Sequence, residues 1–184
     1  MLPSEERRRL LELARRTLED VADGRIPARA PINSGDRPGM FVSLHGARHG
    51  PLRGCIGCLT SDASLDEVVV DMTTKAATQD PRFPPVEADE VPDLDIEISV
   101  LNPPEPVGTI EDIVVGRDGL LVVGRGHRGV LLPQVATEHG WDSATFLEET
   151  CRKAGLPRQA AVAPDIDVYK FSAEVFGETS VADT

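Results

Sequence analysis

The chain has 184 residues, of which 40% are hydrophobic and 27% charged, and it carries a formal net charge of −12. This composition is ordinary for a soluble globular protein of one domain or two small lobes, and the acidic balance argues against nucleic-acid binding, which normally shows a basic footprint. No apolar run approaches the roughly 20 residues that cross a bilayer and the first residues lack the pattern of a secretion signal, so we expect a cytoplasmic protein with reduced cysteines and no membrane association.

The N-terminal part predicts one helix followed by a pair of strands. Apolar residues at helical spacing predict a helix over 4–22, with Ser4 as its N-cap. A loop over 26–39, which holds three prolines, follows this helix. Strands are then predicted over 40–44 and 52–59, with a glycine-bounded turn between them.

A second helix and a third strand come next. Ser64 and Glu67 have the spacing of a capping box, which predicts that a helix begins here. Pro81 ends that helix, because the residue before a proline is pushed out of helical geometry. Apolar and polar side chains alternate over 94–101, so this segment predicts a strand with one buried face.

The proline-rich run 102–106 is the best candidate for a domain boundary. A late strand over 168–176 alternates well and is expected to pair with the first sheet, beside 52–59 or 94–101. We therefore predict an α+β fold of two lobes, each with an antiparallel sheet and flanking helices. The larger lobe comprises residues 1–104 plus 166–184, and the smaller inserted lobe comprises 105–165. Between the boundary and the late strand, the pattern predicts three short strands and two helices: 113–115, 120–124, 129–132, 133–139 and 142–154.

The run Leu52-Arg53-Gly54-Cys55-Ile56-Gly57 is the most informative segment of the chain. In an extended strand Arg53, Cys55 and Gly57 share one face. Glycine weakens a strand interior, so it usually marks a close approach by another backbone or by a ligand. One face therefore offers a cation and a thiol beside a position without a side chain, which indicates a site but names no reaction.

The same six residues resemble the signature of the AMMECR family, whose prokaryotic members are known as AmmeMemoRadiSam system protein A. The resemblance implies two α+β lobes with a cleft lined by the motif, but no settled activity. It also implies a shared modification pathway with a MEMO-like protein and a radical SAM enzyme. We expect the cleft to act on or dock a large substrate. Further segments resemble the family and occur in its order: 80–85 (DPRFPP), 97–101 (EISVL), 128–136 (RGVLLPQVA) and 140–142 (GWD).

Cys55, Arg53 and Glu97 are the candidate catalytic residues. A guanidinium near a thiol favours the thiolate, which is the nucleophilic form. Glu97 lies on the polar face of its strand, where it is a candidate general base or an ion-pair partner for Arg53. The alternative is that Cys55 is a small buried residue in a sheet, as most free cysteines are.

Five further residues are candidates for substrate binding. Gly54 and Gly57 leave space for a closely approaching ligand. Asp80 and Arg82 follow the second helix; they either pin a loop by an ion pair or, as the resemblance implies, face the cleft. His127 lies in a glycine-rich turn, where it either donates a hydrogen bond to an anion or is an ordinary loop residue.

Cys55 and Cys58 have the spacing of a redox or metal-binding pair. In a regular strand this separation puts them on opposite faces, so we predict neither a disulfide nor a zinc site with His45 and His49. No cofactor is predicted. Two hypotheses stay open: an enzyme or enzyme subunit that uses Cys55 and Arg53, and a non-catalytic binding module for a protein partner.

Overall fold

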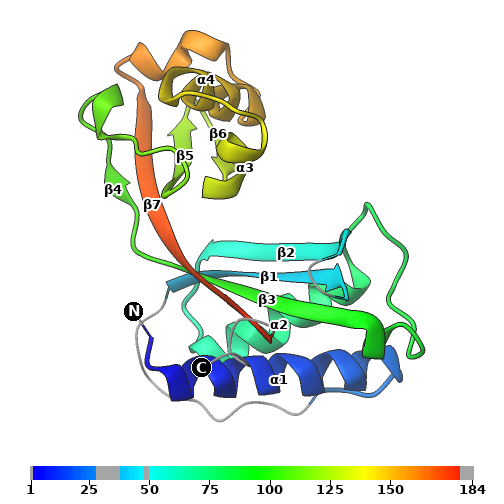
Figure 1. Cartoon of the computed structure of the whole chain (residues 1–184). Coiled ribbons are helices and arrows are strands. Elements are labelled where there is room, and N and C mark those ends of the chain that lie inside the picture. Colours follow the sequence, from blue (N-terminus) through cyan, green and yellow to red (C-terminus); the bar gives the residue numbers. More distant parts are fainter. Residues whose placement is uncertain (1, 28–37, 48–49, 179–184) are drawn as a thin grey trace. The chain divides into compact units, whose positions relative to one another are not determined.

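The computed structural model describes residues 2–27, 38–47 and 50–178 (Figure 1). The chain divides into two compact units: Met1–Leu101 with Glu174–Thr184, and Asn102–Ala173. The last strand, β7 (Ile166–Gly177), contributes residues to both units. The prediction that this strand pairs with the first sheet is confirmed, because β7 lies next to β3 (Leu94–Leu101). It also pairs with β5 (Asp118–Gly124), so residues 166–173 group with the second unit and its C-terminal end groups with the first.

The first unit contains an antiparallel sheet in which β1 (Pro38–Gly46) lies between β2 (Leu52–Thr60) and β3 (Leu94–Leu101). The strand predicted over 94–101 is confirmed. The register brings three strands together at one row, where Ser43 of β1 faces Cys55 of β2 and, on the other side, Glu97 of β3. Among the described strands β2 lies at the edge of the sheet, so none of them pairs with its outer backbone groups.

Two helices cover one face of this sheet, α1 (Ser4–Ala22) and α2 (Leu65–Thr78) (Figure 1). The Ser64–Glu67 capping box is confirmed, and both of its hydrogen bonds are present. Ser4 is not a cap: Pro3 occupies the N-cap, so Ser4 is the first helical residue. The core under the helices includes Leu10, Leu18, Met40, Val42, Leu44, Val69, Ile96 and Ile98.

The second unit contains β5 (Asp118–Gly124) between β6 (His127–Leu131) and the first part of β7, with the short β4 (Glu105–Pro106) on the other side of β7. Helices α3 (Pro133–Glu138) and α4 (Ser143–Lys153) pack against β5 and β6 (Figure 1).

The strand predicted over 113–115 is absent from this described part of the chain. A 3-10 turn, η2 (Ile110–Asp112), directly precedes the segment. The Val114 amide donates to the Asp118 carboxylate at 2.9 Å, and the Val114 carbonyl accepts from the Asp118 amide at 2.9 Å. These local hydrogen bonds occupy the backbone groups that would otherwise pair with a neighbouring strand. The protein is thus an α+β protein built on antiparallel strands, and no described helix is long and apolar enough to cross a membrane.

Candidate functional site

The candidate site is built around Cys55, in the middle of β2. Its thiol accepts a hydrogen bond from the Ser43 hydroxyl at 3.2 Å across the strand pair. Glu97 lies next to Ser43 on the other side, so a thiol, a hydroxyl and a carboxylate share one row of the sheet. Cys58 packs against the helix-covered core. The prediction that Cys55 and Cys58 point to opposite faces is therefore confirmed.

Burial raises the pKa of the Cys55 thiol above its usual value. The hydrogen bond from Ser43 and the nearby Arg82 guanidinium act in the opposite direction, whereas the charges of Asp80 and Glu97 add to the increase. Arg53 is not among the groups that stabilise the thiolate. At neutral pH this environment keeps Cys55 as a thiol, which is a poor nucleophile.

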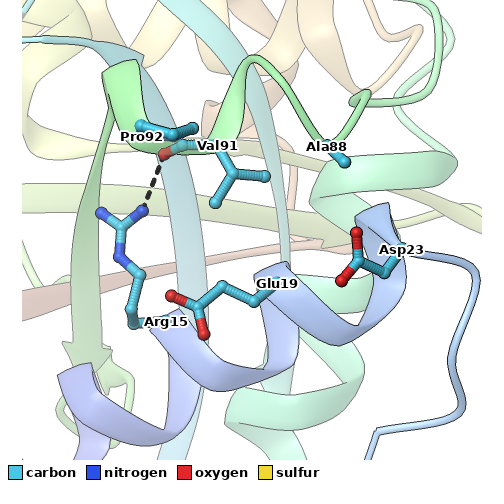
Figure 2. Close-up of a pocket in the computed structure, with 6 residues that line it drawn as sticks. All are labelled: Arg15, Glu19, Asp23, Ala88, Val91 and Pro92. Carbon is cyan, nitrogen blue, oxygen red and sulfur yellow. Dashed lines mark hydrogen bonds between the residues drawn. The ribbon is translucent and has the colours of Figure 1, made fainter.

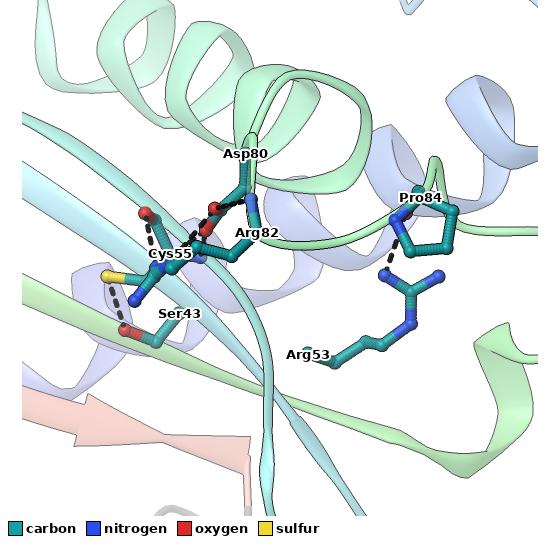
Figure 3. Close-up of polar contacts among 6 residues, drawn as sticks. All are labelled: Ser43, Arg53, Cys55, Asp80, Arg82 and Pro84. Carbon is teal, nitrogen blue, oxygen red and sulfur yellow. Dashed lines mark hydrogen bonds and ion pairs between the residues drawn. The ribbon is translucent and has the colours of Figure 1, made fainter.

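Asp80 and Arg82 bind the backbone of Cys55 on the outer edge of β2 (Figure 3). The Asp80 carboxylate accepts from the Cys55 amide at 2.9 Å, and the Arg82 guanidinium donates to the Cys55 carbonyl at 3.4 Å. The same guanidinium forms a two-point ion pair with Asp80, at 2.9 and 2.6 Å. The pair therefore closes this position of the edge strand, much as a neighbouring strand would.

The pKa of the Asp80 carboxyl is held far below its usual range, chiefly by the hydrogen bonds from the Arg82 guanidinium, although burial opposes this. The backbone amides of Cys55 and Arg82 act in the same direction as the guanidinium. Asp80 is 2% exposed and Arg82 is 55% exposed. The buried partner is thus a permanently charged anchor, and the guanidinium reaches it from the surface.

Arg53 points away from the thiol. Figure 3 shows its guanidinium turned toward Pro84, whose carbonyl accepts a hydrogen bond at 2.9 Å. A second bond goes to the Pro85 carbonyl at 3.3 Å, and two more go to the Glu90 carboxylate at 2.9 Å each. Side-chain exposure of Arg53 is 17%. The charge of Arg53 is therefore matched by Glu90, and its donors hold the backbone of a loop.

The two glycines of the motif are explained by packing. A Cβ atom at Gly54 would lie 2.3 Å from the carbonyl oxygen of Ala76, so Gly54 lets α2 approach β2 closely. A Cβ at Gly57 would lie 2.2 Å from the ring of Phe41, its cross-strand neighbour. The space that we expected beside Gly57 is filled by that ring.

Together these contacts fix residues 79–90, which we call the anchored loop. Asp80 and Arg82 attach its first part to Cys55, and Arg53 holds its second part through Glu90 and two proline carbonyls. Val86 is buried in the core of the first unit, and its amide donates to the Ala77 carbonyl at 2.8 Å. The motif strand therefore serves as the base on which this loop is held.

His127 belongs to the second unit, whereas the motif strand and the anchored loop belong to the first. Its Nδ1–H donates to the carbonyl of Ala154, at the end of α4, over 3.0 Å. This bond satisfies one of the carbonyls that a helix leaves without a partner at its C-terminus. His127 thus has a local structural role.

No group of three or more metal-binding side chains occurs within residues 2–27, 38–47 and 50–178. His49, one of the four residues weighed as zinc ligands, lies outside these ranges.

A surface pocket of about 440 Å³ lies elsewhere in the first unit, between α1 and the 3-10 turn η1 (Val91–Asp93) (Figure 2). Arg15 donates to the Val91 carbonyl at 3.0 Å and also binds the carbonyl of Leu94 and the carboxylate of Glu178. Its donors are thus used to tie α1 to η1 and to the chain's end. None of the predicted site residues lines this pocket.

Ser43, Glu90 and Phe41 were not among the predicted site residues. Ser43 and Phe41 follow from the register of the first two strands, which a correct alignment of the hairpin would have given. Glu90 had no local signal, because its pairing with Arg53 depends on how the anchored loop folds back.

The geometry defines a class of protein: an α+β protein whose motif strand holds a rigid loop on an edge of its antiparallel sheet. The AMMECR1 family model matches residues 11–176 of the chain. The chain belongs to this family.

Similar proteins cover nearly the whole chain. A protein of Methanothermobacter thermautotrophicus is 43% identical, with 96% of each chain covered. One from Thermococcus gammatolerans is 45% identical over 92% of this chain and 88% of its own. The crystal structure of an uncharacterized protein from Pyrococcus horikoshii matches with a TM-score of 0.84 and 40% identity, covering 94% of this chain and 91% of that one.

Proposed function

We propose that this protein is a non-catalytic binding subunit that presents the anchored loop to a protein partner. Its partners would be the MEMO-like protein and the radical SAM enzyme of a shared modification pathway, in which those proteins supply the chemistry. This is the binding-module hypothesis of the sequence analysis, now attached to particular residues.

One observation carries the proposal: the charged groups of the motif region are used to hold the loop. The Arg53 guanidinium donates hydrogen bonds to Glu90 and to the carbonyls of Pro84 and Pro85. The Asp80 carboxylate accepts hydrogen bonds from Arg82 and from the Cys55 amide. A catalytic acid or base must come within hydrogen-bond reach of the proton that it transfers, whereas the hydrogen bonds of Arg53 and Asp80 go to the loop and to the strand beneath it. These groups instead stabilise a shape.

The tip of the anchored loop has the composition of a binding epitope. Arg82, Pro84 and Pro85 are exposed and Phe83 is half-buried. The Arg82 guanidinium lies 5.4 Å from the centre of the Phe83 ring, in cation–π range. Arginine and aromatic side chains are enriched among residues that dominate binding energy. A loop that is already ordered loses less conformational entropy on binding, which favours affinity.

A second candidate function, thiol chemistry at Cys55, is favoured by the row of Cys55, Ser43 and Glu97. In this alternative the thiol is the nucleophile, and the neighbouring groups move its proton. The raised pKa of Cys55 counts against it. Substitution Cys55→Ser separates the two functions, because it removes the nucleophile and leaves the anchored loop in place.

The proposal is tested by measuring binding of the purified full chain to the MEMO-like protein and to the radical SAM enzyme encoded in the same genome. We expect Phe83→Ala and Arg82→Ala to weaken binding by about tenfold or more, as for residues at the centre of an interface. Cys55→Ser should bind like wild type. The control is Arg25→Ala, since Arg25 is a similarly exposed arginine of the first unit that is paired with aspartates.

Two results would contradict the proposal. In the first, neither partner binds the wild-type chain. In the second, a partner binds, and the loop variants bind as tightly as Arg25→Ala. Loss of binding in Cys55→Ser, with the loop variants unaffected, would favour the thiol alternative.

A further inference from the structure

The second unit contains a pocket of about 330 Å³ that none of the preceding roles uses. The residues that line it come from the end of β6, from the turn before α4 and from the last two turns of α4: Leu131, Trp141, Glu149, Arg152 and Lys153. The volume lies in the range of small-molecule sites. The lining combines apolar side chains, two cationic groups and one carboxylate.

Trp141 forms an aromatic wall of the pocket. It packs against the core cluster of Ile113, Leu120, Ala136 and Phe146. The ring of His139 meets the indole edge-to-face at 89°, with 4.6 Å between ring centres. Leu131, which packs against the same cluster, adds a second apolar surface. A planar ring that enters the pocket would therefore find apolar and aromatic surface already in place.

The carboxylate in the pocket is neutralised by its neighbours. Glu149 is buried and accepts from Arg152 at 2.6 Å and from Arg158 at 2.7 Å. These arginines hold the pKa of Glu149 below its usual value, with Arg152 contributing most. Glu149 therefore positions the Arg152 guanidinium and does not leave an uncompensated negative charge in the pocket.

Lys153 supplies positive charge that is not matched. Within residues 2–27, 38–47 and 50–178, its ammonium group has no hydrogen bond or ion pair, and Arg152 is bonded through Nε alone. Arg152, Lys153 and Arg158 outnumber the nearby Glu148 and Glu149 by one charge. In a chain of net charge −12, this local excess of positive charge favours an anion.

We infer that this pocket binds a small phosphorylated ligand with an aromatic ring, of the size of a mononucleotide. The ring would lie against Trp141 and Leu131, and the phosphate would contact Lys153 and the outer nitrogens of Arg152. Stacking on aromatic side chains and cationic contacts to phosphate are the usual means of binding such ligands. The inference does not depend on the anchored loop, because all of its residues belong to the second unit.

Trp141 is the single tryptophan of the chain, so it provides a direct reporter. In a ¹⁵N-labelled full chain its indole N–H gives one resonance, which can be followed during titration at low ionic strength. The probes are adenosine 5′-monophosphate, adenosine and inorganic phosphate. We expect a saturable shift with the monophosphate, and weaker binding of adenosine, which lacks the charge, and of phosphate, which lacks the ring.

The substitution Lys153→Gln removes the unmatched charge and should weaken binding of the monophosphate by about tenfold, the worth of one charge-assisted contact. The control is Lys75→Gln, because Lys75 also lies in the last turn of a helix. A cation placed there only to complement the helix dipole would bind no ligand. The absence of a saturable shift would overturn the inference. So would equal affinity for adenosine and its monophosphate, or an equal effect of both lysine substitutions.

Discussion

Substitution Asp80→Asn keeps the shape of the side chain and removes its charge. The carboxylate now accepts from four donors: the amides of Cys55 and Arg82, and two nitrogens of the Arg82 guanidinium. An amide has one accepting oxygen, and its NH₂ group must face one of these donors. The substitution therefore weakens charged hydrogen bonds and leaves at least one buried donor without an acceptor.

The expected loss in the free energy of unfolding is roughly 2–3 kcal/mol, the range for a hydrogen bond to a charged group combined with an unsatisfied buried donor. It stays below the larger values of fully buried ion pairs, because Arg82 is 55% exposed and water can solvate it. The matched control is Asp165→Asn in the Arg125–Asp165 pair, where Asp165 is 53% exposed. There we expect a loss of under about 1 kcal/mol.

Urea unfolding followed by far-UV circular dichroism measures both losses. Tryptophan fluorescence would not serve for Asp80, because Trp141 lies in the second unit. The pH dependence of this stability difference gives a second test, because its direction can be predicted. The native pKa of Asp80 is depressed, so its stabilisation is complete well above the unfolded-chain pKa of about 3.9 and is lost progressively as the pH falls from there toward the depressed native pKa. The difference between wild type and Asp80→Asn should therefore shrink on acidification. Equal losses for Asp80→Asn and Asp165→Asn, or a difference that grows toward low pH, would refute the reasoning.

Two further outcomes are expected. With iodoacetamide at neutral pH, Cys55 and Cys151 should react more slowly than glutathione, because burial raises the pKa of both thiols. Peptide mass spectrometry distinguishes the labelled sites. Rapid labelling of Cys55 would argue for the enzyme hypothesis. Substitution Gly54→Ala should destabilise the protein by about 1–3 kcal/mol, because its Cβ would meet the backbone oxygen of Ala76. Gly46→Ala, whose Cβ would lie 3.5 Å from its nearest neighbour, should cost much less in the same urea experiment, and a reversed order would contradict the packing argument.

Local patterns in the sequence predicted the elements of the first unit well. The capping box at Ser64 and the alternation over Leu94–Leu101 depend on neighbouring residues, so both could be read without the fold. The segment 113–115 was misassigned, because its β-branched residues suggested a strand while Asp118 binds the Val114 amide.

The candidate site was only partly predictable. Strand parity placed Cys55 and Cys58 on opposite faces, and an ion pair between Asp80 and Arg82 was one of the stated alternatives. The partner of Arg53 was not predictable. Strand parity predicted the face of the sheet from which the Arg53 side chain starts. A long side chain, however, can bond to any group that the tertiary fold brings near it. Its partner Glu90 lies 37 residues later in the sequence.

Hydrogen exchange in the anchored loop tests the central claim most directly, namely that the motif strand holds this loop. The amides of Phe83 and Val86 bond to backbone carbonyls, and that of Glu87 bonds to the Glu90 carboxylate at 2.9 Å. Exchange of residues 79–90 should be slow in the wild type. In Arg53→Ala it should accelerate strongly, because Glu90 and two proline carbonyls lose their donor, while exchange in α1 stays unchanged. Unchanged exchange of the loop in Arg53→Ala, with Arg25→Ala as the reference, would contradict the account.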